Sequence, residues 1–443
     1  MKKYENYKPS GVPWIGEIPS HWDTMKIKFY CHSISSGATP STNVSGYWDG
    51  DIPWIPSGCC HDCDVNEAPK FITKEGLNSC STQIIPAGTT LMAMTGATCS
   101  QVGFLTIDAA TNQSVMAYRE NKKKADARFL FYVLQGAREY VLTHQTGGAQ
   151  AGIDGQDCSN LIVPKVPIEE QRKIASYLDE KCTQINKIID TQRKRAALLR
   201  ELRSNVITKT LTRGLDANVR LKNTGIQWIG DIPEHWEMRS LKFLCKPIRF
   251  SIKTGPFGTQ LKGEDLKSEG DVRVYNQRNV LDSQFETVQY YVSTEKANEL
   301  SNFVTQKNDL LITSRGTIGR AAILPRDAGM GILHPCLIAL RIDTRKFDLE
   351  WLRMFINDSS CFSTNVFINS NATTIEVIYT DTLKGIKIPV PPIEEQIKTV
   401  NYLKDEISGI DRSILHSDQI INNLLSYKQA LIKETVSGKR KVY

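Results

Sequence analysis

Two stretches of the chain have the apolar spacing of a long amphipathic helix. In the second half, the seam positions alternate between spacings of four and three residues, and nearly all of them are apolar. This spacing is typical of a coiled-coil helix, which buries one narrow stripe against a partner helix. The seam positions of this stretch are Leu403, Ile407, Ile410, Ile414, Ser417, Ile421, Leu424, Lys428 and Leu431.

The same seam occurs 225 residues earlier in the chain. Its interruptions coincide as well, because Gln192 matches Ser417 and Arg203 matches Lys428. We expect the two helices to pair with each other as antiparallel rods of roughly 60 Å, related by a pseudo-twofold axis. The polar seam positions either fix the register of this pairing or lie at frayed, solvated parts of the seam. The earlier seam comprises Leu178, Cys182, Ile185, Ile189, Gln192, Ala196, Leu199, Arg203 and Val206.

Both predicted helices begin with the same short sequence. Residues 167–171 and 392–396 both read Pro-Ile-Glu-Glu-Gln. A proline before the first turn and two glutamates within it suit the exposed N–H groups and the positive end of the helix dipole. The sequence therefore predicts a helix N-terminus at each block.

A second block also occurs twice. Residues 11–22, which read Gly-Val-Pro-Trp-Ile-Gly-Glu-Ile-Pro-Ser-His-Trp, return with few changes at 225–236, an offset of 214. The stretch between the two kinds of block is thus eleven residues longer in the second half, and stretches 31–163 and 245–388 show little similarity. A repeated frame therefore encloses two different contents.

The enclosed stretches have the pattern of α/β or α+β domains of roughly 150 residues. The chain then divides into a first domain (1–163), a first spacer helix (164–213), a second domain (214–388) and a second spacer helix (389–443), with a polar, turn-rich crossover at 212–224. Predicted strands are 51–55, 90–94, 102–105, 309–313 and 337–342, and predicted domain helices are 127–134 and 349–356.

Composition limits the class of protein. A chain of 443 residues with 40% apolar residues is expected to form two or three soluble globular domains. It contains no run of about 18 apolar residues, and its polar N-terminus lacks the apolar segment of a signal peptide. Eleven cysteines, an odd number without an export signal, indicate reduced thiols and a cytoplasmic location.

The positive charge of the chain is concentrated in one segment. The formal net charge is +7, and residues 171–213 carry eleven Lys and Arg against four Asp and Glu. Such an excess either neutralises phosphates of a nucleic acid or forms an ordinary solvated helix face. The sequence leaves both interpretations open.

The repeated frame resembles the specificity subunit of type I restriction-modification systems. The resemblance rests on the paired Trp-Ile-Gly-x-Ile-Pro-x-His-Trp blocks, the paired Pro-Ile-x-Glu-Gln helix starts, and four further elements between them. Together these cover nearly the whole chain in the expected order. The further elements are Ser36-Gly37-Ala38-Thr39-Pro40, Tyr47-Trp48 with Ile52-Pro53-Trp54-Ile55, Thr95-Gly96-Ala97-Thr98, and Asn112-Gln113.

The resemblance implies a non-catalytic, DNA-binding subunit with two target-recognition domains, each reading one half of a bipartite, asymmetric site in double-stranded DNA. It implies that the helices set the spacing and dock two modification subunits, which carry S-adenosylmethionine and methylate adenine, and that motor-nuclease subunits can join. The second half departs from the pattern, because Ser314-Arg315-Gly316-Thr317 stands for the Thr-Gly-Ala-Thr element and His334-Pro335 stands near the Asn-Gln position.

Two other functions compete with this interpretation. A self-sufficient DNA methyltransferase would need an Asn or Asp before Pro-Pro-Tyr or Pro-Pro-Phe, but Pro391-Pro392 follows Val390 and opens a helix. No phosphate-binding Gly-x-x-x-x-Gly-Lys-Ser/Thr loop occurs either. A coiled-coil scaffold that does not bind DNA would explain the helices but not two unlike domains.

Two further motifs suggest a metal site and a catalytic site, but each has a simpler explanation. Cys59-Cys60-His61-Asp62-Cys63 has Cys80 as its only nearby addition, whereas a zinc site usually takes two separated ligand pairs, so we predict no metal. His21 and His235 each precede a tryptophan at equivalent repeat positions, which favours packing of the frame over catalysis, since no nucleophile accompanies them.

Base reading is expected from polar loop residues that flank the predicted strands. Arg and Lys can pair with guanine, and Asn and Gln with adenine; each candidate has an ordinary solvated loop residue as its alternative. Arg278 and Arg315 are the leading candidates. The candidates are Thr39, Ser57, His61, Thr95, Thr98, Gln101 and Gln150 in the first domain, and Lys253, Gln260, Gln277, Arg278, Asn279, Ser314, Arg315 and Thr317 in the second.

Overall fold

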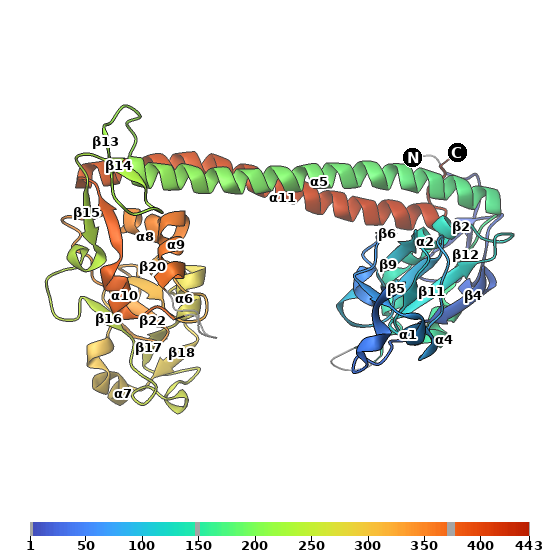
Figure 1. The fold of residues 1–443 in the computed structure, drawn as a ribbon, viewed down its shortest axis with the longest axis horizontal. Coiled ribbons are helices and arrows are strands. Elements are labelled where there is room, and N and C mark those ends of the chain that lie inside the picture. Colours follow the sequence, from blue (N-terminus) through green and yellow to red (C-terminus); the bar gives the residue numbers. More distant parts are fainter. Residues whose placement is uncertain (1–2, 147–150, 370–376, 443) are drawn as a thin grey trace. The chain divides into compact units, whose positions relative to one another are not determined.

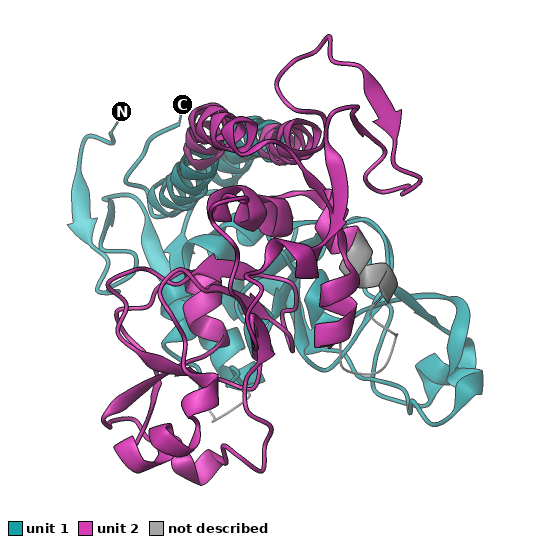
Figure 2. Ribbon diagram, turned by 90° about the vertical axis from the view of Figure 1, so that its left-hand side faces the viewer, with its two compact units in different colours: residues 1–193, 418–443 teal, residues 194–417 magenta. Residues whose placement is uncertain are grey.

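The computed structural model describes residues 3–146, 151–369 and 377–442. Along the chain, two mixed α/β domains alternate with two long helices (Figure 1). The long helices are α5 (Ile168–Arg213) and α11 (Ile393–Val436), each beginning with two glutamates in its first turn as predicted. The chain forms two compact units, shown in different colours in Figure 2. Unit 1 contains residues 1–193 and 418–443, and unit 2 contains residues 194–417, so each unit includes part of both helices.

Within each unit the two long helices pack against each other. In unit 1, Ile185 and Ile189 of α5 share an apolar cluster with Leu431 of α11. In unit 2, Val206 of α5 packs against another cluster, which contains Leu403 and Ile407 of α11. The predicted seam is therefore present in both units.

Two polar contacts show that the pairing is antiparallel. In unit 1 the ammonium of Lys428 donates to Asn186 Oδ1 at 2.9 Å, and in unit 2 the Nε of Arg203 donates to Asp411 Oδ1 at 2.8 Å. The residue numbers of the two pairs add up to the same total, as an antiparallel register requires. Two predicted interruptions of the seam are thus contacts between the helices. The expectation of antiparallel pairing is confirmed within each unit.

The buried stripe of each helix is wider than the predicted seam near its C-terminal end. Ile207 and Leu211 of α5, and Ile432 and Val436 of α11, are fully buried although none is a seam position. They belong to clusters that also contain residues of the neighbouring domain. The spacing rule missed them because these helix ends face a domain as well as a helix.

The other two polar seam positions behave differently. Gln192 Oε1 and Ser417 Oγ are buried and have no hydrogen-bond partner among the residues that the structure describes. A buried polar atom without a partner is costly, so the Gln192 side-chain carbonyl and the Ser417 hydroxyl do not strengthen the seam by hydrogen bonding. Their role in fixing the register stays a prediction.

The domain of unit 1 is built on two sheets. The larger has the strand order β4-β11-β8-β9-β6, and the smaller has the order β10-β5-β7. Helix α2 contacts β8, β9 and β11 of the larger sheet. The elements are β1 (Tyr7–Pro9), β2 (Glu17–Pro19), β3 (Asp23–Lys26), β4 (Cys31–Ser36), β5 (Trp48–Ile55), β6 (Cys63–Val65), β7 (Lys70–Ile72), α1 (Lys74–Asn78), β8 (Thr90–Ala93), β9 (Val102–Leu105), β10 (Ala110–Thr111), β11 (Val115–Glu120), α2 (Ala127–Gly136), α3 (Arg138–Leu142), α4 (Gly155–Asn160) and β12 (Ile162–Lys165).

The domain of unit 2 repeats this topology. Its larger sheet has the order β16-β22-β19-β20, which matches β4-β11-β8-β9, and its smaller sheet β18-β17-β21 again pairs one strand antiparallel and one parallel to the central strand. The elements are β13 (Leu221–Asn223), β14 (Asp231–Pro233), β15 (Glu237–Ser240), β16 (Ile252–Thr254), β17 (Val272–Tyr275), α6 (Gln277–Asp282), β18 (Tyr290–Val292), α7 (Thr294–Glu299), β19 (Leu310–Thr313), β20 (Ala321–Ile323), β21 (Gly331–Leu333), β22 (Leu337–Leu340), α8 (Leu349–Asp358), α9 (Ser360–Asn369), α10 (Thr380–Gly385) and β23 (Lys387–Val390).

The predicted domain elements are present. All five predicted strands and both predicted domain helices overlap observed ones, to within a few residues at their ends. The crossover at 212–224 is not all loop, because β13 lies inside it and pairs with β14. A polar strand such as Leu221–Asn223, whose residues are all exposed, has no apolar alternation to reveal it.

The two repeated sequence blocks bind each other in both units. In unit 1, the Trp22 indole donates to Glu170 Oε2 at 2.9 Å, and His21 Nε2 lies 2.8 Å from Glu170 Oε1. In unit 2, Trp236 and His235 contact Glu395 at the same two distances. One carboxylate in the first turn of each long helix thus holds both polar ring atoms of a His-Trp pair. The expected packing role of His21 and His235 agrees with this geometry.

The glutamine that follows each of these glutamates connects the long helix to a domain helix. Gln171 Nε2 donates to the carbonyl of Val166 at 2.7 Å, and its Oε1 accepts from the backbone N–H of Asp126 at 2.9 Å. Asp126 is the N-cap of α2. Gln396 makes the same kind of contact with Asp348, the N-cap of α8, at 2.7 Å. The Glu-Gln pair therefore fixes how each domain is attached to its helix.

No helix in the described part of the chain is long and apolar enough to cross a membrane.

Replacing Glu170 with alanine is expected to lower the free energy of unfolding by about 2–3 kcal/mol, because the buried Trp22 indole loses a charged acceptor. Chemical denaturation followed by tryptophan fluorescence measures this. Glu169→Ala is the matched control, since Glu169 is an exposed neighbour that pairs with exposed Arg172. Equal losses in the two variants would show that the His-Trp contact does not stabilise the frame.

Candidate nucleic-acid interface

In unit 1, one edge of the larger sheet gathers most of the predicted base-reading residues. Because β4 and β8 each pair antiparallel with β11, and β9 with β8, the ends of β4 and β8 and the starts of β11 and β9 meet at this edge. Strand β6 runs parallel to β9 and begins there too. The loops at this edge thus include 37–47, 56–62, 94–101 and 112–114.

Side-chain contacts connect these loops. Thr39 Oγ1 donates to Gln113 Oε1 at 2.5 Å, and His61 Nδ1 lies 2.9 Å from Gln101 Oε1. His61 is exposed, and Thr39, Ser57, Thr95, Thr98 and Gln101 are half-buried, so each retains some accessible surface. Gln150 lies outside the described residues. The edge therefore presents several donors and acceptors side by side.

The equivalent edge of unit 2 gathers a second set. Gln277, at the start of α6, donates from Nε2 to the carbonyl of Thr317 at 3.3 Å, and Arg315 and Thr317 are exposed. Gly316 has a φ of +72° and lies against the Gln277 amide, where a β-carbon would be crowded. Gln260 is exposed in the loop that follows β16. These residues form a polar surface at the ends of β16, β17 and β19.

Arg278 is a highly accessible candidate. Its side chain is 81% exposed and pairs with Asp282 one helical turn later at 3.3 Å. An exposed pair of this kind contributes little, so the guanidinium can exchange its partner at low cost. The structure is therefore compatible with Arg278 as a reading residue.

Three candidates of the second domain are poorly placed. Asn279 is buried, and its amide donates to the carbonyls of Gln284 and Thr287 at 2.8 and 2.9 Å. Ser314 is buried as well. As placed here, neither side chain can be reached by a base edge. The sequence shows that both residues are polar and lie near the end of a strand, but it does not show that their side chains are buried.

Lys253 is also misplaced, since it lies inside β16 and not in a loop. Its ammonium stands 4.1 and 4.2 Å from the ring centres of Phe250 and Phe303 and donates to the carbonyl of Asn302. Burial, with the charges of Arg341 and Arg249, lowers the pKa of this group. These contacts already occupy the ammonium.

The backbone shows which positions of the two domains correspond. Thr95 follows β8 and Arg315 follows β19, and each precedes a glycine with positive φ, +69° at Gly96 and +72° at Gly316. Asn112 donates its backbone N–H to the last residue of β5 at 3.1 Å, as His334 does to the last residue of β17 at 3.0 Å. Equivalent places thus carry chemically different side chains.

Two residues of this interface were missed as reading candidates. Gln113 is exposed beside Thr39, and the imidazole of His334 stacks on Tyr290 with an interplanar angle of 19°. Burial lowers the pKa of His334, which favours a neutral ring able to donate and accept. The sequence did offer a sign of both, because Gln113 belongs to the Asn112-Gln113 element and His334 stands near the equivalent position of the second half.

The cysteine-rich loop has no metal-site geometry. Within residues 3–146, 151–369 and 377–442, no three or more His, Cys, Asp or Glu side chains converge as ligands would. Cys60 is buried, which raises the pKa of its thiol, whereas Cys63 is exposed. Asp62 of this loop instead pairs with Arg138.

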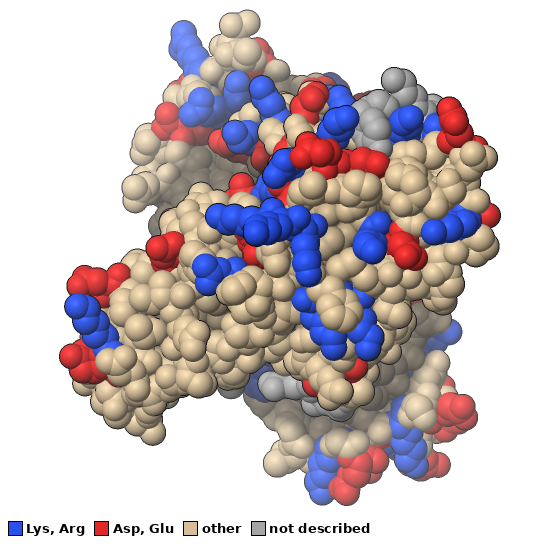
Figure 3. All heavy atoms as spheres, turned by 90° about the vertical axis from the view of Figure 1, so that its right-hand side faces the viewer, with Lys and Arg blue, Asp and Glu red and all other residues tan. Residues whose placement is uncertain are grey.

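Charge alone does not outline the interface. Figure 3 shows Lys and Arg side chains in several groups on one face, with acidic side chains close to many of them. On α5, exposed Arg172 and Arg193 pair with Glu169 and Asp190 three residues earlier. Part of the excess charge of residues 171–213 is thus balanced locally.

Comparison with known proteins gives a consistent result. A family model described as type I restriction modification DNA specificity domain matches residues 19–196 and 233–424. The MjaVIII specificity subunit of a type I restriction enzyme from Methanocaldococcus jannaschii is 23% identical over 447 residues, 99% of this chain and 94% of that protein. The EcoR124I/EcoR124II specificity subunit of Escherichia coli is 26% identical over 197 residues, 43% of this chain and 47% of that protein.

Solved structures show the same fold. A chain from a study of complex assembly and conformational transition of the type I R-M system has a TM-score of 0.70 at 16% identity, covering 95% of this chain and 98% of its own. The HsdS subunit from Thermoanaerobacter tengcongensis has a TM-score of 0.51 at 16% identity, covering 96% and 98%. The predicted architecture of two α/β domains with two long helices is thereby confirmed.

Arg315→Ala is expected to relax sequence discrimination at the base pairs read by the second domain, by about ten-fold or more at one position, since a bidentate contact to guanine contributes about 1–3 kcal/mol. Selection from randomised duplexes measures it. Arg345→Ala is the control, because Arg345 is exposed beyond the opposite end of β22 and pairs with Asp343. A uniform loss of affinity across sequences would assign Arg315 to a phosphate instead.

Proposed function

Because the chain belongs to the family of type I restriction-modification DNA specificity domains, we propose that it is the non-catalytic, DNA-reading subunit of such a system. The observation that carries this proposal is the repeated frame with unlike side chains at matching edges, such as Thr95 against Arg315 and Asn112 against His334. Base edges are read by local side chains. Each domain then reads one half of a bipartite, asymmetric site in double-stranded DNA.

The long helices set the distance between the two half-sites in this proposal. Helix α5 is one continuous element of 46 residues and α11 one of 44. A rigid connection is required because the spacing of half-sites follows the geometry of the protein.

The helices also dock two modification subunits. Their paired seam leaves large apolar side chains exposed on other faces, Ile188 and Tyr427 in unit 1 and Leu198 and Leu415 in unit 2, with Leu415 59% exposed. Exposed apolar groups of this size are typical of interaction surfaces when they cluster. Because each unit has its own set, one modification subunit binds each unit.

S-adenosylmethionine belongs to these partners in the proposal. A partner that methylates adenine must take the base out of the stack, and the specificity subunit supplies the position on the DNA. Motor-nuclease subunits can join the complex for cleavage. A cytoplasmic location, where genomic DNA is accessible, is part of the same proposal.

Neither competing function has a supporting observation. The Pro-Pro motif that a self-sufficient methyltransferase would need is absent from the sequence, since Pro391-Pro392 follows Val390 and precedes the first turn of α11. A scaffold that does not bind DNA does not explain two domains of one topology with unlike loop edges.

Incubation with labelled S-adenosylmethionine and genomic DNA tests the division of labour. We expect no methyl transfer by the purified chain or by a modification subunit on its own, and transfer to adenine when the two are combined, because reading and chemistry reside on different chains. The readout is label on DNA. Transfer by the purified chain alone would contradict the proposal and favour the methyltransferase.

A further inference from the structure

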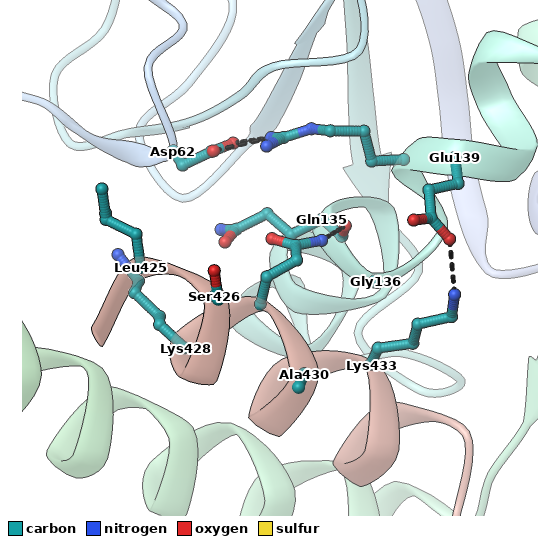
Figure 4. A pocket seen from close by; sticks show the side chains of 11 residues that line it. Asp62, Gln135, Gly136, Glu139, Leu425, Ser426, Lys428, Ala430 and Lys433 are labelled. Atoms are coloured by element: carbon teal, nitrogen blue, oxygen red, sulfur yellow. Dashed lines mark hydrogen bonds and ion pairs between the residues drawn. The ribbon is translucent and has the colours of Figure 1, made fainter. Parts of the chain in front are cut away.

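Unit 1 contains a cavity where α11 passes the end of α2 (Figure 4). Its volume is about 680 Å³, and its walls come from the loop before β6, from the α2–α3 junction and from α11. Gln135 and Gly136 form one side, and Lys428 and Lys433 stand on the helix opposite. The corresponding place in unit 2 shows what this cavity lacks.

In unit 2 the equivalent contact is closed by two carboxylates. Arg203, the repeat equivalent of Lys428, donates to Asp358 Oδ1 at 3.1 Å and to Asp411 Oδ1 at 2.8 Å. Asp358 is the last residue of α8, as Gly136 is the last residue of α2. The seam cation of unit 2 is therefore fully neutralised by its own chain.

In unit 1 both carboxylates are replaced by neutral residues. Lys428 donates to Asn186 Oδ1 at 2.9 Å, where unit 2 has Asp411, and Gly136 stands where unit 2 has Asp358. A side chain at Gly136 would press against Val436, because an added β-carbon lies 2.7 Å from Val436 Cγ2. Among the described residues no carboxylate pairs with Lys428, so its ammonium can accept a carboxylate from outside the chain.

The cavity also has buried donors without acceptors. Gln135 is 2% exposed, and its Nε2 has no hydrogen-bond partner among the described residues. Figure 4 shows its side chain extending into the space between the loop of Asp62 and helix α11. Arg138 Nε is a second such atom. Donors of this kind are costly to leave unsatisfied, and what they need is an oxygen acceptor.

The remaining charges of the wall are paired. Arg138 donates to Asp62 at 2.6 Å, and Lys433 donates to Glu139 at 2.6 Å. Among the described residues of this wall, Lys428 thus provides the one charge without an oppositely charged partner, and the cavity suits a single negative charge. The wall also includes the exposed apolar side chain of Leu425.

We propose that this cavity receives an aspartate or glutamate side chain of a modification subunit, an inference that rests on the proposed function. The carboxylate pairs with Lys428 and, once the buried Gln135 side chain rotates toward it, accepts from Gln135 Nε2, while its methylene groups lie against Leu425. A DNA phosphate fits less well, because the backbone brings further negative charges toward Asp62 and Glu139. The contact exists in unit 1 only, so the two docking positions are not equivalent.

The test is titration of the purified modification subunit into the full-length chain by calorimetry, without DNA. The wild type is expected to bind two copies. Asn186→Asp supplies Lys428 with the carboxylate that Asp411 gives Arg203, and should weaken one of the two sites by about ten-fold while leaving the other unchanged. Lys428→Gln should weaken the same site, and Lys428→Arg should retain it.

Asp411→Asn is the matched control, because it changes the equivalent position of unit 2 while Arg203 keeps Asp358; both sites should stay as in the wild type. Two unweakened sites in both Asn186→Asp and Lys428→Gln would overturn the pocket but not the proposed function. Unchanged subunit binding with weaker DNA binding of the assembled complex would assign the cavity to a phosphate and also overturn it. No binding of the modification subunit by the wild type would contradict the proposed function itself.

Discussion

The architecture depends on one contact that occurs in both units. A carboxylate in the first turn of each long helix binds the His-Trp pair of the preceding domain. Glu170 and Glu395 make this contact with the same distances in both units. The next residue, a glutamine, connects the helix to the N-cap of α2 or α8. Each domain is therefore attached to its helix by a short polar motif and not by its loops, which leaves the loops free to differ.

The two halves of the chain differ where the frame does not constrain them. The larger sheets share a strand order, yet the edge that follows β8 presents Thr95 and the edge that follows β19 presents Arg315. The same holds for the seam, where Arg203 has two carboxylate partners and Lys428 has Asn186. Duplication explains the common geometry, and local substitution explains why each half recognises something different.

Much of the fold was predictable because it rests on periodic patterns. The seam positions Ile185 and Leu403 follow from their spacing, the helix starts follow from the Pro-Ile-Glu-Glu-Gln blocks, and the strand 102–105 follows from its short apolar run. Contacts between elements far apart in the sequence were not predictable. Ile207 and Val436 are buried in clusters that include domain residues, and Arg203 and Lys428, which interrupt the apolar seam, form hydrogen bonds across it. For the interface, the sequence predicts the loops but not the direction of their side chains. It shows that Asn279, Ser314 and Gln113 are polar, but not that the first two are buried and the third is exposed.

The central claim is that two unlike readers on one repeated frame recognise one split DNA site. Mapping methylated adenines across the genome of a cell that expresses the complete system tests it most directly. The account predicts a single asymmetric motif, with two different specified halves separated by a fixed number of unspecified base pairs. An uninterrupted motif, or two identical halves, would contradict it.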